Sequence, residues 1–203
     1  MKKLHIDIRE VDLRGRPGDV LVKPVDSIDK ATQELCKSTE EMKRTIFKYS
    51  GANQGKQFKK TANAVVEFSI ELYNISLELN ELQHQVIEYA YKVARFEDET
   101  ASFSPHPMTV NRVRCEVNTG VVYFYKQDMI DLEKALGKYR NDVEAAKKKL
   151  KQQSDALDSV WRDEQKKAFN EYIGEVMAVI NKGENALEEY REYLDRKIKE
   201  FSN

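Results

Sequence analysis

The sequence has few of the residues that break, cross-link or anchor a chain. Only 8 glycines and 4 prolines occur in 203 residues, which disfavours a fold of many short strands and turns. The two cysteines, Cys36 and Cys115, are too few for a disulfide framework and have no metal-binding spacing. No run of 18 apolar residues occurs, so we expect no integral membrane segment. The 34 basic residues balance the 35 acidic ones, so we expect no nucleic-acid partner.

The N-terminal stretch also lacks the apolar core of a signal peptide. The first twenty residues alternate charged with β-branched side chains. The sequence therefore predicts a cytoplasmic protein, with export by a signal-peptide-independent route left open.

What the sequence has in abundance is helical periodicity. Apolar residues recur at steps of four and three from Phe58 to Phe96, which predicts a helix of about 60 Å. A shorter stripe runs from Ile28 to Tyr49, with Asp26 and Ser27 as candidate N-caps. Residues 49–55 contain two glycines and are the predicted turn, so the first half forms a helical hairpin.

The second half repeats this order. One heptad stripe runs from Leu132 to Val160 and is broken at Gln153, and another runs from Phe169 to Phe201 with a gap at Gly183. Residues 158–159 are Asp and Ser, a candidate N-cap that places the break between the two helices beside them. A second helical hairpin is therefore predicted.

A short β-hairpin is predicted ahead of each helical hairpin. Residues 4–11 and 20–22 alternate around a Pro-Gly turn, and residues 110–117 and 121–125 alternate around Asn-Thr-Gly. Residues 97–108 carry an acidic run and two prolines and are predicted to be a loop.

The two halves also align with each other. A shift of 102 positions superposes residues 20–22 on 122–124, so we interpret the chain as a duplication of one unit of about 100 residues. The predicted organisation is a first repeat at 1–97, a linker at 98–108 and a second repeat at 109–203. The predicted fold class is mainly α: an elongated antiparallel four-helix bundle of two helical hairpins, each preceded by its β-hairpin and packed as one compact unit.

Two turn motifs resemble a known family. They are Trp161-Arg162-Asp163 followed by Phe169, and Tyr49-Ser50-Gly51 followed by Phe58. A Trp-x-Gly turn with an aromatic residue about eight positions later is the mark of the small WxG-type proteins that type VII secretion systems export. Each half keeps one end of the motif, since Asp163 replaces the glycine and Tyr49 replaces the tryptophan. The family's Tyr-x-x-x-Asp/Glu export signal is absent, because Leu194 follows Tyr190 at the fourth place and Lys197 follows Tyr193.

The residues give little indication of catalysis or cofactor binding. None of the three histidines has a metal-binding spacing. His84 lies near Glu81 and Glu88, which is either a ligand cluster or a solvated helix face. The basic run at residues 147–151 is either a phosphate site or a solvated face. We therefore expect no enzyme activity, no cofactor and no metal.

The predicted function is that of a non-enzymatic helical interaction protein, an adaptor or chaperone-like module linked to a type VII-like secretion system. The alternative is a membrane-surface or curvature-binding helical rod. The expected partner is another helical protein or a secretion component, and the chain itself is expected to be a monomer or a homodimer. The candidate partner-binding residues are Trp161, Asp163, Phe169, Tyr49, Gly51, Phe58, Tyr123 and Tyr125.

Two of these assignments have structural alternatives. Trp161 is expected to be a partly buried core residue at its turn, or else part of an exposed patch with Phe169. Tyr123 and Tyr125 either cover a helix or form an exposed aromatic edge for a partner.

Overall fold

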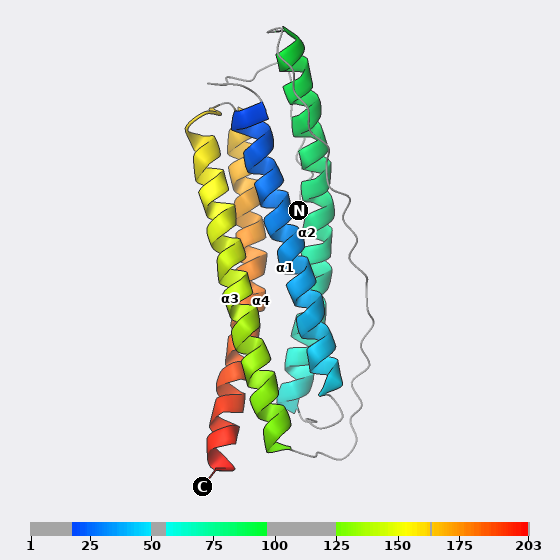
Figure 1. Ribbon diagram of the computed structural model, residues 1–203, viewed down its shortest axis with the longest axis vertical. Coiled ribbons are helices and arrows are strands. Elements are labelled where there is room, and N and C mark those ends of the chain that lie inside the picture. The colour runs from blue at the N-terminus through cyan, green and yellow to red at the C-terminus, as the bar shows by residue number, and fades with distance from the viewer. Residues whose placement is uncertain (1–17, 50–55, 97–124, 163, 203) are drawn as a thin grey trace. The chain divides into compact units, whose positions relative to one another are not determined.

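The computed structural model describes residues 18–49, 56–96, 125–162 and 164–202, and nearly all of them are helical (Figure 1). A short π-helix at Gly18–Val22 leads into α1, and three further α-helices follow. The helices are α1 at Lys23–Lys48, α2 at Lys56–Phe96, α3 at Lys126–Asp158 and α4 at Glu164–Glu200. With 26, 41, 33 and 37 residues they make up about two-thirds of the chain, which confirms the mainly α class.

The apolar stripes fall on the buried faces of these helices. All six residues of the predicted stripe from Ile28 to Tyr49 are buried; the first five lie in α1 and Tyr49 directly follows it. In α2 the stripe is buried from Phe58 to Tyr89, and at 1.5 Å per residue the helix is about 60 Å long. Phe201 is an exception: it directly follows the last residue of α4 and is exposed.

The predicted strand at residues 20–22 is wrong. These residues belong to the π-helix, where Leu21 and Val22 are buried and Val22 forms a cluster with Ile87 and Ala90 of α2. Helical backbone buries these consecutive apolar side chains on one side, whereas a strand would point them to opposite faces. The other residues of the two predicted β-hairpins lie outside the described ranges, except Tyr125, which has no regular structure.

Both predicted N-caps are also wrong. Asp26 lies inside α1, where its carboxylate accepts hydrogen bonds from Lys30 (2.6 Å) and from Gln83 of α2 (3.3 Å). Asp158 is the last residue of α3, and α4 begins only at Glu164. The Asp26 carboxylate binds Lys30 of its own helix and Gln83 of α2, and the Asp158 carboxylate binds Lys166 and Asn170 of α4.

The Cα positions divide the chain into two compact units, and every helix contributes a segment to each. Unit 1 comprises Met1–Glu34, Asn74–Thr109 and Ala146–Ala178; unit 2 comprises Leu35–Tyr73, Val110–Ala145 and Val179–Asn203. Neither unit coincides with the predicted repeats, and the duplication itself stays a prediction.

In unit 1, α1 and α4 each contact both α2 and α3. Gln83 of α2 donates to Asp26 of α1, and Lys149 of α3 lies 3.9 Å from Glu34 of α1. The Tyr172 hydroxyl of α4 donates to the Ile75 carbonyl of α2, and α4 also binds the end of α3 through Lys166 and Asp158. The order around the unit is therefore α1, α2, α4, α3.

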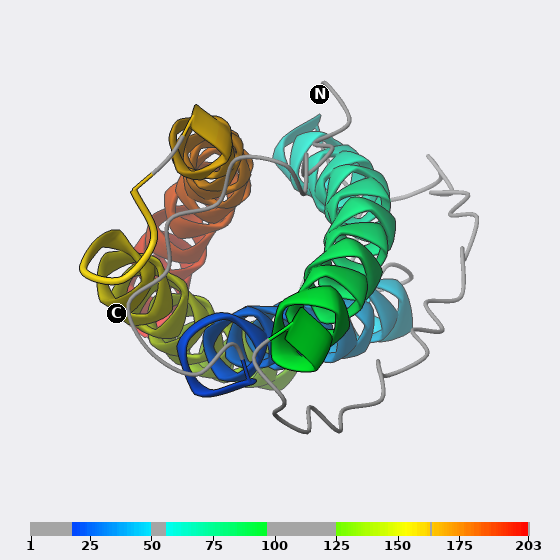
Figure 2. The same ribbon diagram turned by 90° about the horizontal axis from the view of Figure 1, so that it is seen from above.

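Unit 2 has the same order. Its contacts between neighbouring helices are Lys43 with Ser69 (3.1 Å), Thr39 with Tyr139 (2.7 Å), Phe58 with Tyr190 (ring centroids 6.1 Å) and Arg191 with Glu133 (2.9 Å). Figure 2 shows α1 beside both α2 and α3, in agreement with these contacts. Along each pair, residue numbers rise on one helix as they fall on the other, so all neighbouring segments are antiparallel.

Candidate functional site

The turn between α3 and α4, in unit 1, holds the motif that starts at Trp161. The Val160 and Trp161 N–H groups both donate to the Leu157 carbonyl, at 3.2 and 2.9 Å, and so close the end of α3. Trp161 is only 1 % exposed and Phe169 is fully buried, with their ring centroids 5.7 Å apart. The prediction that Trp161 is a core residue is confirmed, and its burial exceeds the partial burial expected.

A buried lysine fixes this turn. The Lys166 ammonium lies 2.8 Å from the Asp158 carboxylate, 3.4 Å from the Ser154 carbonyl and in contact with the Asn170 side-chain oxygen. It also sits 5.0 Å from the centroid of the Phe169 ring. A cation at the C-terminal end of α3 is favourable for the helix dipole. Because carboxylate, carbonyl and amide oxygens surround the ammonium, it acts as a structural cation.

The same contacts shift the titration of Asp158. The hydrogen bond from Lys166 is the main reason that the pKa of this carboxyl lies below its ordinary value of 3.8. A hydrogen bond from Asn170 (3.0 Å) and the charge of Lys166 act in the same direction, while burial opposes them.

The corresponding motif of the first hairpin lies in unit 2. Tyr49 follows α1, with its N–H bound to the Thr45 carbonyl and Lys48 lying 5.1 Å from its ring centroid. Phe58 is buried and makes an edge-on contact with Tyr190 of α4. Sequence similarity between the two turns therefore does not carry over to their aromatic contacts.

The remaining candidate partner-binding residues divide into two groups. Tyr125 lies directly before α3 and is 59 % exposed. Of the five candidate residues that the structure describes, it alone has a mostly exposed side chain. Gly51, Tyr123 and Asp163 lie outside the described residues. Trp161, Phe169, Tyr49 and Phe58 all contribute to the interior of their units.

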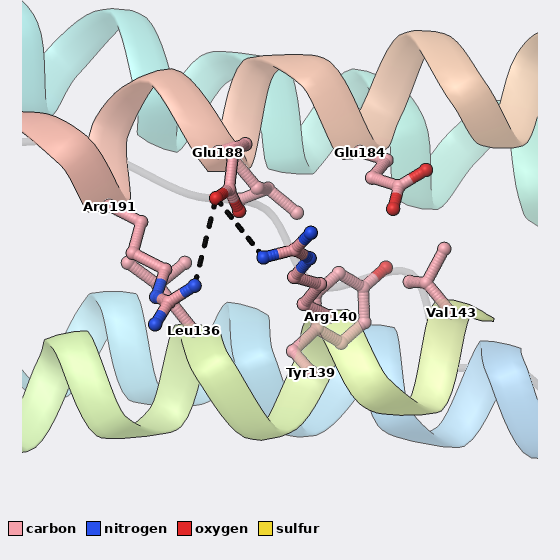
Figure 3. A pocket seen from close by; sticks show the side chains of 8 residues that line it. Leu136, Tyr139, Arg140, Val143, Glu184, Glu188 and Arg191 are labelled. Atoms are coloured by element: carbon pink, nitrogen blue, oxygen red, sulfur yellow. Dashed lines mark hydrogen bonds and ion pairs between the residues drawn. The ribbon is translucent and has the colours of Figure 1, made fainter. Parts of the chain in front are cut away.

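Sequence reasoning missed a groove between α3 and α4 in unit 2 (Figure 3). Its cavity volume is only about 10 Å³, and Leu136, Tyr139, Val143 and Leu187 form its apolar lining. Arg140 and Arg191 both reach the Glu188 carboxylate, at 3.4 and 3.6 Å. Only the fold brings these charges together, although Glu184, Glu188 and Arg191 share one helix face in the sequence.

The charges of this groove compensate one another. Glu184, Glu188 and Arg191 come from α4 and Arg140 from α3, and Arg191 also donates to Glu133 of α3 at 2.9 Å. Tyr139 shares a hydrogen bond with Thr39, and burial raises the pKa of its phenol far above the ordinary value. The groove is therefore a salt-bridged contact between two helices, without an excess charge to attract a small ion.

The described residues contain no group of three or more histidine, cysteine or acidic side chains that could hold a metal ion. His84, Glu81 and Glu88 are exposed on α2, in agreement with a solvated face. Within the same residues, no helix is long and apolar enough to cross a membrane.

Comparison of the chain with protein-family models, with curated proteins and with solved structures finds no match. The resemblance to WxG-type proteins therefore stays a prediction that rests on the two turn motifs.

Proposed function

We propose that the chain is a non-enzymatic interaction protein that binds another helical protein as an adaptor or chaperone-like module. One observation carries this proposal: α2 bears three of the five large apolar side chains that the described residues expose. They are Ile70 (42 % exposed) in unit 2, and Leu77 (45 %) and Tyr91 (37 %) in unit 1. Within unit 1, the spacing of 14 residues places Leu77 and Tyr91 on one face of the helix.

The internal packing leaves Ile70, Leu77 and Tyr91 exposed. The heptad stripes of all four helices are largely buried within the units, so the apolar residues on the outer face of α2 are not required for the bundle contacts. Exposed apolar residues at helical spacing are what a partner helix needs for packing. The type VII-like context and the WxG kinship are the finer part of this proposal and are supported only by the turn motifs.

Site-specific photo-crosslinking tests the proposal. A photoreactive phenylalanine analogue at Ile70 or Leu77, in cells that produce the protein natively, should cross-link to a helical protein. The same group at the exposed Lys148 of α3 is the matched control and should not. Equal cross-linking from all three positions, or none from α2, would overturn the proposal. Fractionation of cells and medium in the same experiment tests export.

The membrane-surface alternative stays a prediction with its own test. This alternative requires a cationic face on the protein. Co-sedimentation of the full chain with anionic vesicles measures membrane binding directly. Binding that falls as salt is raised would support this alternative over the helical partner.

A further inference from the structure

The part of α1 that belongs to unit 2, residues 35–48, is attached to α2 through an ion pair and a hydroxyl group. Lys43 is buried, contacts the Glu40 carboxylate of its own helix and donates to the Ser69 hydroxyl of α2 at 3.1 Å. The Ser69 hydroxyl in turn donates to Glu40 at 3.1 Å. Charged and polar groups therefore fill part of the contact between α1 and α2.

The contact between the same segment and α3 is also polar, and it is incompletely packed. The Ser38 hydroxyl donates to the Asp142 carboxylate, and the Thr39 and Tyr139 hydroxyls share a hydrogen bond of 2.7 Å. A cavity of about 80 Å³ lies between the two helices, with Ser38, Tyr139 and Asp142 in its lining. This cavity has room for water, so part of the contact is made without direct packing of side chains.

Helix α4 is attached in unit 2 by a different kind of contact. The Phe58 ring of α2 packs edge-on against Tyr190, and the Phe68 ring of α2 occupies the space where Gly183 would otherwise carry a side chain. No charged side chain is buried among residues 179–202, all of which the structure describes. The buried residues of this part of α4 are Ile180, Gly183, Leu187, Tyr190 and Leu194.

These two kinds of contact respond differently when a helix separates from its neighbours. Burial takes Lys43 and Glu40 out of water at a cost that their attraction offsets only in part, so exposure of the pair recovers hydration free energy. Exposure of apolar side chains recovers none and has the full cost of the lost burial. Local opening is therefore less costly for residues 35–48 than for α4 in unit 2.

We propose that residues 35–48 of α1 form a detachable cover, which opens from α2 and α3 as one piece while α4 stays packed in unit 2. Opening uncovers Leu35, Met42 and Ile46, which are at most 3 % exposed in the closed form. The chain thus holds a sheltered apolar surface in addition to the exposed residues of α2. This opening is a property of the chain alone and does not depend on the proposed function.

Hydrogen exchange of the full chain, followed by mass spectrometry, tests the inference without any substitution. The amides of residues 35–46 should exchange at one common rate, about a hundredfold or more faster than those of residues 180–194. Urea should accelerate this exchange only weakly, because a local opening exposes little surface. Protection equal to that of α4, or protection that rises gradually from the end of α1 towards residue 35, would overturn the inference.

The thiol of Cys36 reports the same opening by an independent method. Cys36 lies within the cover and is buried, with its Sγ 4.0 Å from the Leu72 carbonyl of α2. In a Cys115→Ser background, a soluble thiol reagent should label Cys36 at urea concentrations that leave the circular dichroism unchanged. Labelling that occurs only together with global unfolding would contradict a separate opening of the cover.

A double variant tests whether the buried ion pair is the cause. Glu40→Leu/Lys43→Met replaces the pair with apolar side chains of similar size and should slow the exchange of residues 35–46 by about tenfold or more. Exchange of residues 180–194 should stay unchanged. Absence of any slowing in residues 35–46 would overturn the role of the ion pair.

The matched control removes an ion pair of the same charges from the contact between α2 and α4 in unit 2. Lys60 and Glu189 lie 3.1 Å apart and are both mostly exposed, so Lys60→Met/Glu189→Leu changes no buried charge. Exchange of residues 35–46 should stay within about twofold of the original rate. Equal slowing by both double variants would show that removal of charge, and not the buried pair, controls the opening.

Discussion

Trp161 contacts the Phe169 ring in a site from which water is almost fully excluded. Replacing it with alanine removes a large buried aromatic side chain and leaves a cavity, so Trp161→Ala should lower the free energy of unfolding by about 3–5 kcal/mol. Urea unfolding followed by circular dichroism measures this change. Arg162→Ala, at the exposed neighbouring position, is the control and should change it by less than about 0.5 kcal/mol.

The same residue gives a spectroscopic check, because it is the single tryptophan of the chain. Its emission should be blue-shifted and protected from soluble quenchers in the folded protein. An emission spectrum like that of free indole in water would contradict the burial of this side chain.

Asp158 and Lys166 make the stability of the same turn pH-dependent. The pKa of Asp158 is lower in the folded state than its ordinary value of 3.8. Its contribution to stability is therefore complete above about pH 4 and is lost as pH falls through the lower folded-state pKa. The contribution should be well under about 1 kcal/mol, because half of the carboxylate side chain is exposed to solvent.

Comparison of the protein with Asp158→Asn measures this effect. The difference in unfolding free energy between the two should be constant from about pH 5 to pH 7 and should shrink below about pH 4. A difference that grows as pH falls would contradict the ion pair between Asp158 and Lys166.

At the scale of elements, two glycines of α4 predict opposite results for the same substitution. A Cβ at Gly174 would meet no atom within 4 Å, so Gly174→Ala should raise stability by about 0.5–1 kcal/mol through the lower entropy cost of alanine. A Cβ at Gly183 would lie 2.5 Å from the Phe68 ring of α2. Gly183→Ala should therefore destabilise by about 1–3 kcal/mol through overpacking.

Thermal unfolding of the two variants, followed by circular dichroism, checks this pair directly. If Gly183→Ala destabilises the protein, the apolar stripe of α4 is interrupted by a glycine at position 183 because the Phe68 ring occupies the space of a side chain. Equal stabilisation by both alanines would show that the ring does not pack against α4.

Helix α1 shows how an element can bury polar residues. Asp29, Cys36 and Lys43 are spaced by seven residues and are buried, and Lys43 binds Glu40 of α1 and Ser69 of α2. On the side of α1 that contacts α3, the Thr39 hydroxyl shares a hydrogen bond with the Tyr139 hydroxyl. Polar side chains thus mediate contacts of α1 with both of its neighbours, and such partnered polar groups specify which helices pair.

At the scale of the whole molecule, the buried stripes predict a monomer. Each helix finds its packing partners within the chain, so no stripe is left to drive dimerisation. Light scattering after size-exclusion chromatography should give a mass near 23.6 kDa. An obligate dimer that dissociates only on unfolding would contradict internal packing of the stripes.

The sequence by itself determined the helices. Their positions follow from steps of three and four between apolar residues, a local pattern that one helix satisfies without reference to the others. The stripe from Phe58 predicted α2, and the break predicted beside residues 158–159 coincides with the end of α3 at Asp158. Where the local pattern was short, as at Val20–Val22, burial against α2 decided in favour of helix.

Only the tertiary structure decided which helices are neighbours and which polar residues are buried. A heptad stripe shows that a face is covered and does not identify the helix that covers it. Lys43 and Lys166 therefore resemble solvated lysines in the sequence, and their burial depends on partners at Ser69 and Asp158. The exposure of Leu77 and Tyr91 on α2 is likewise a property of the packed unit and not of the local pattern.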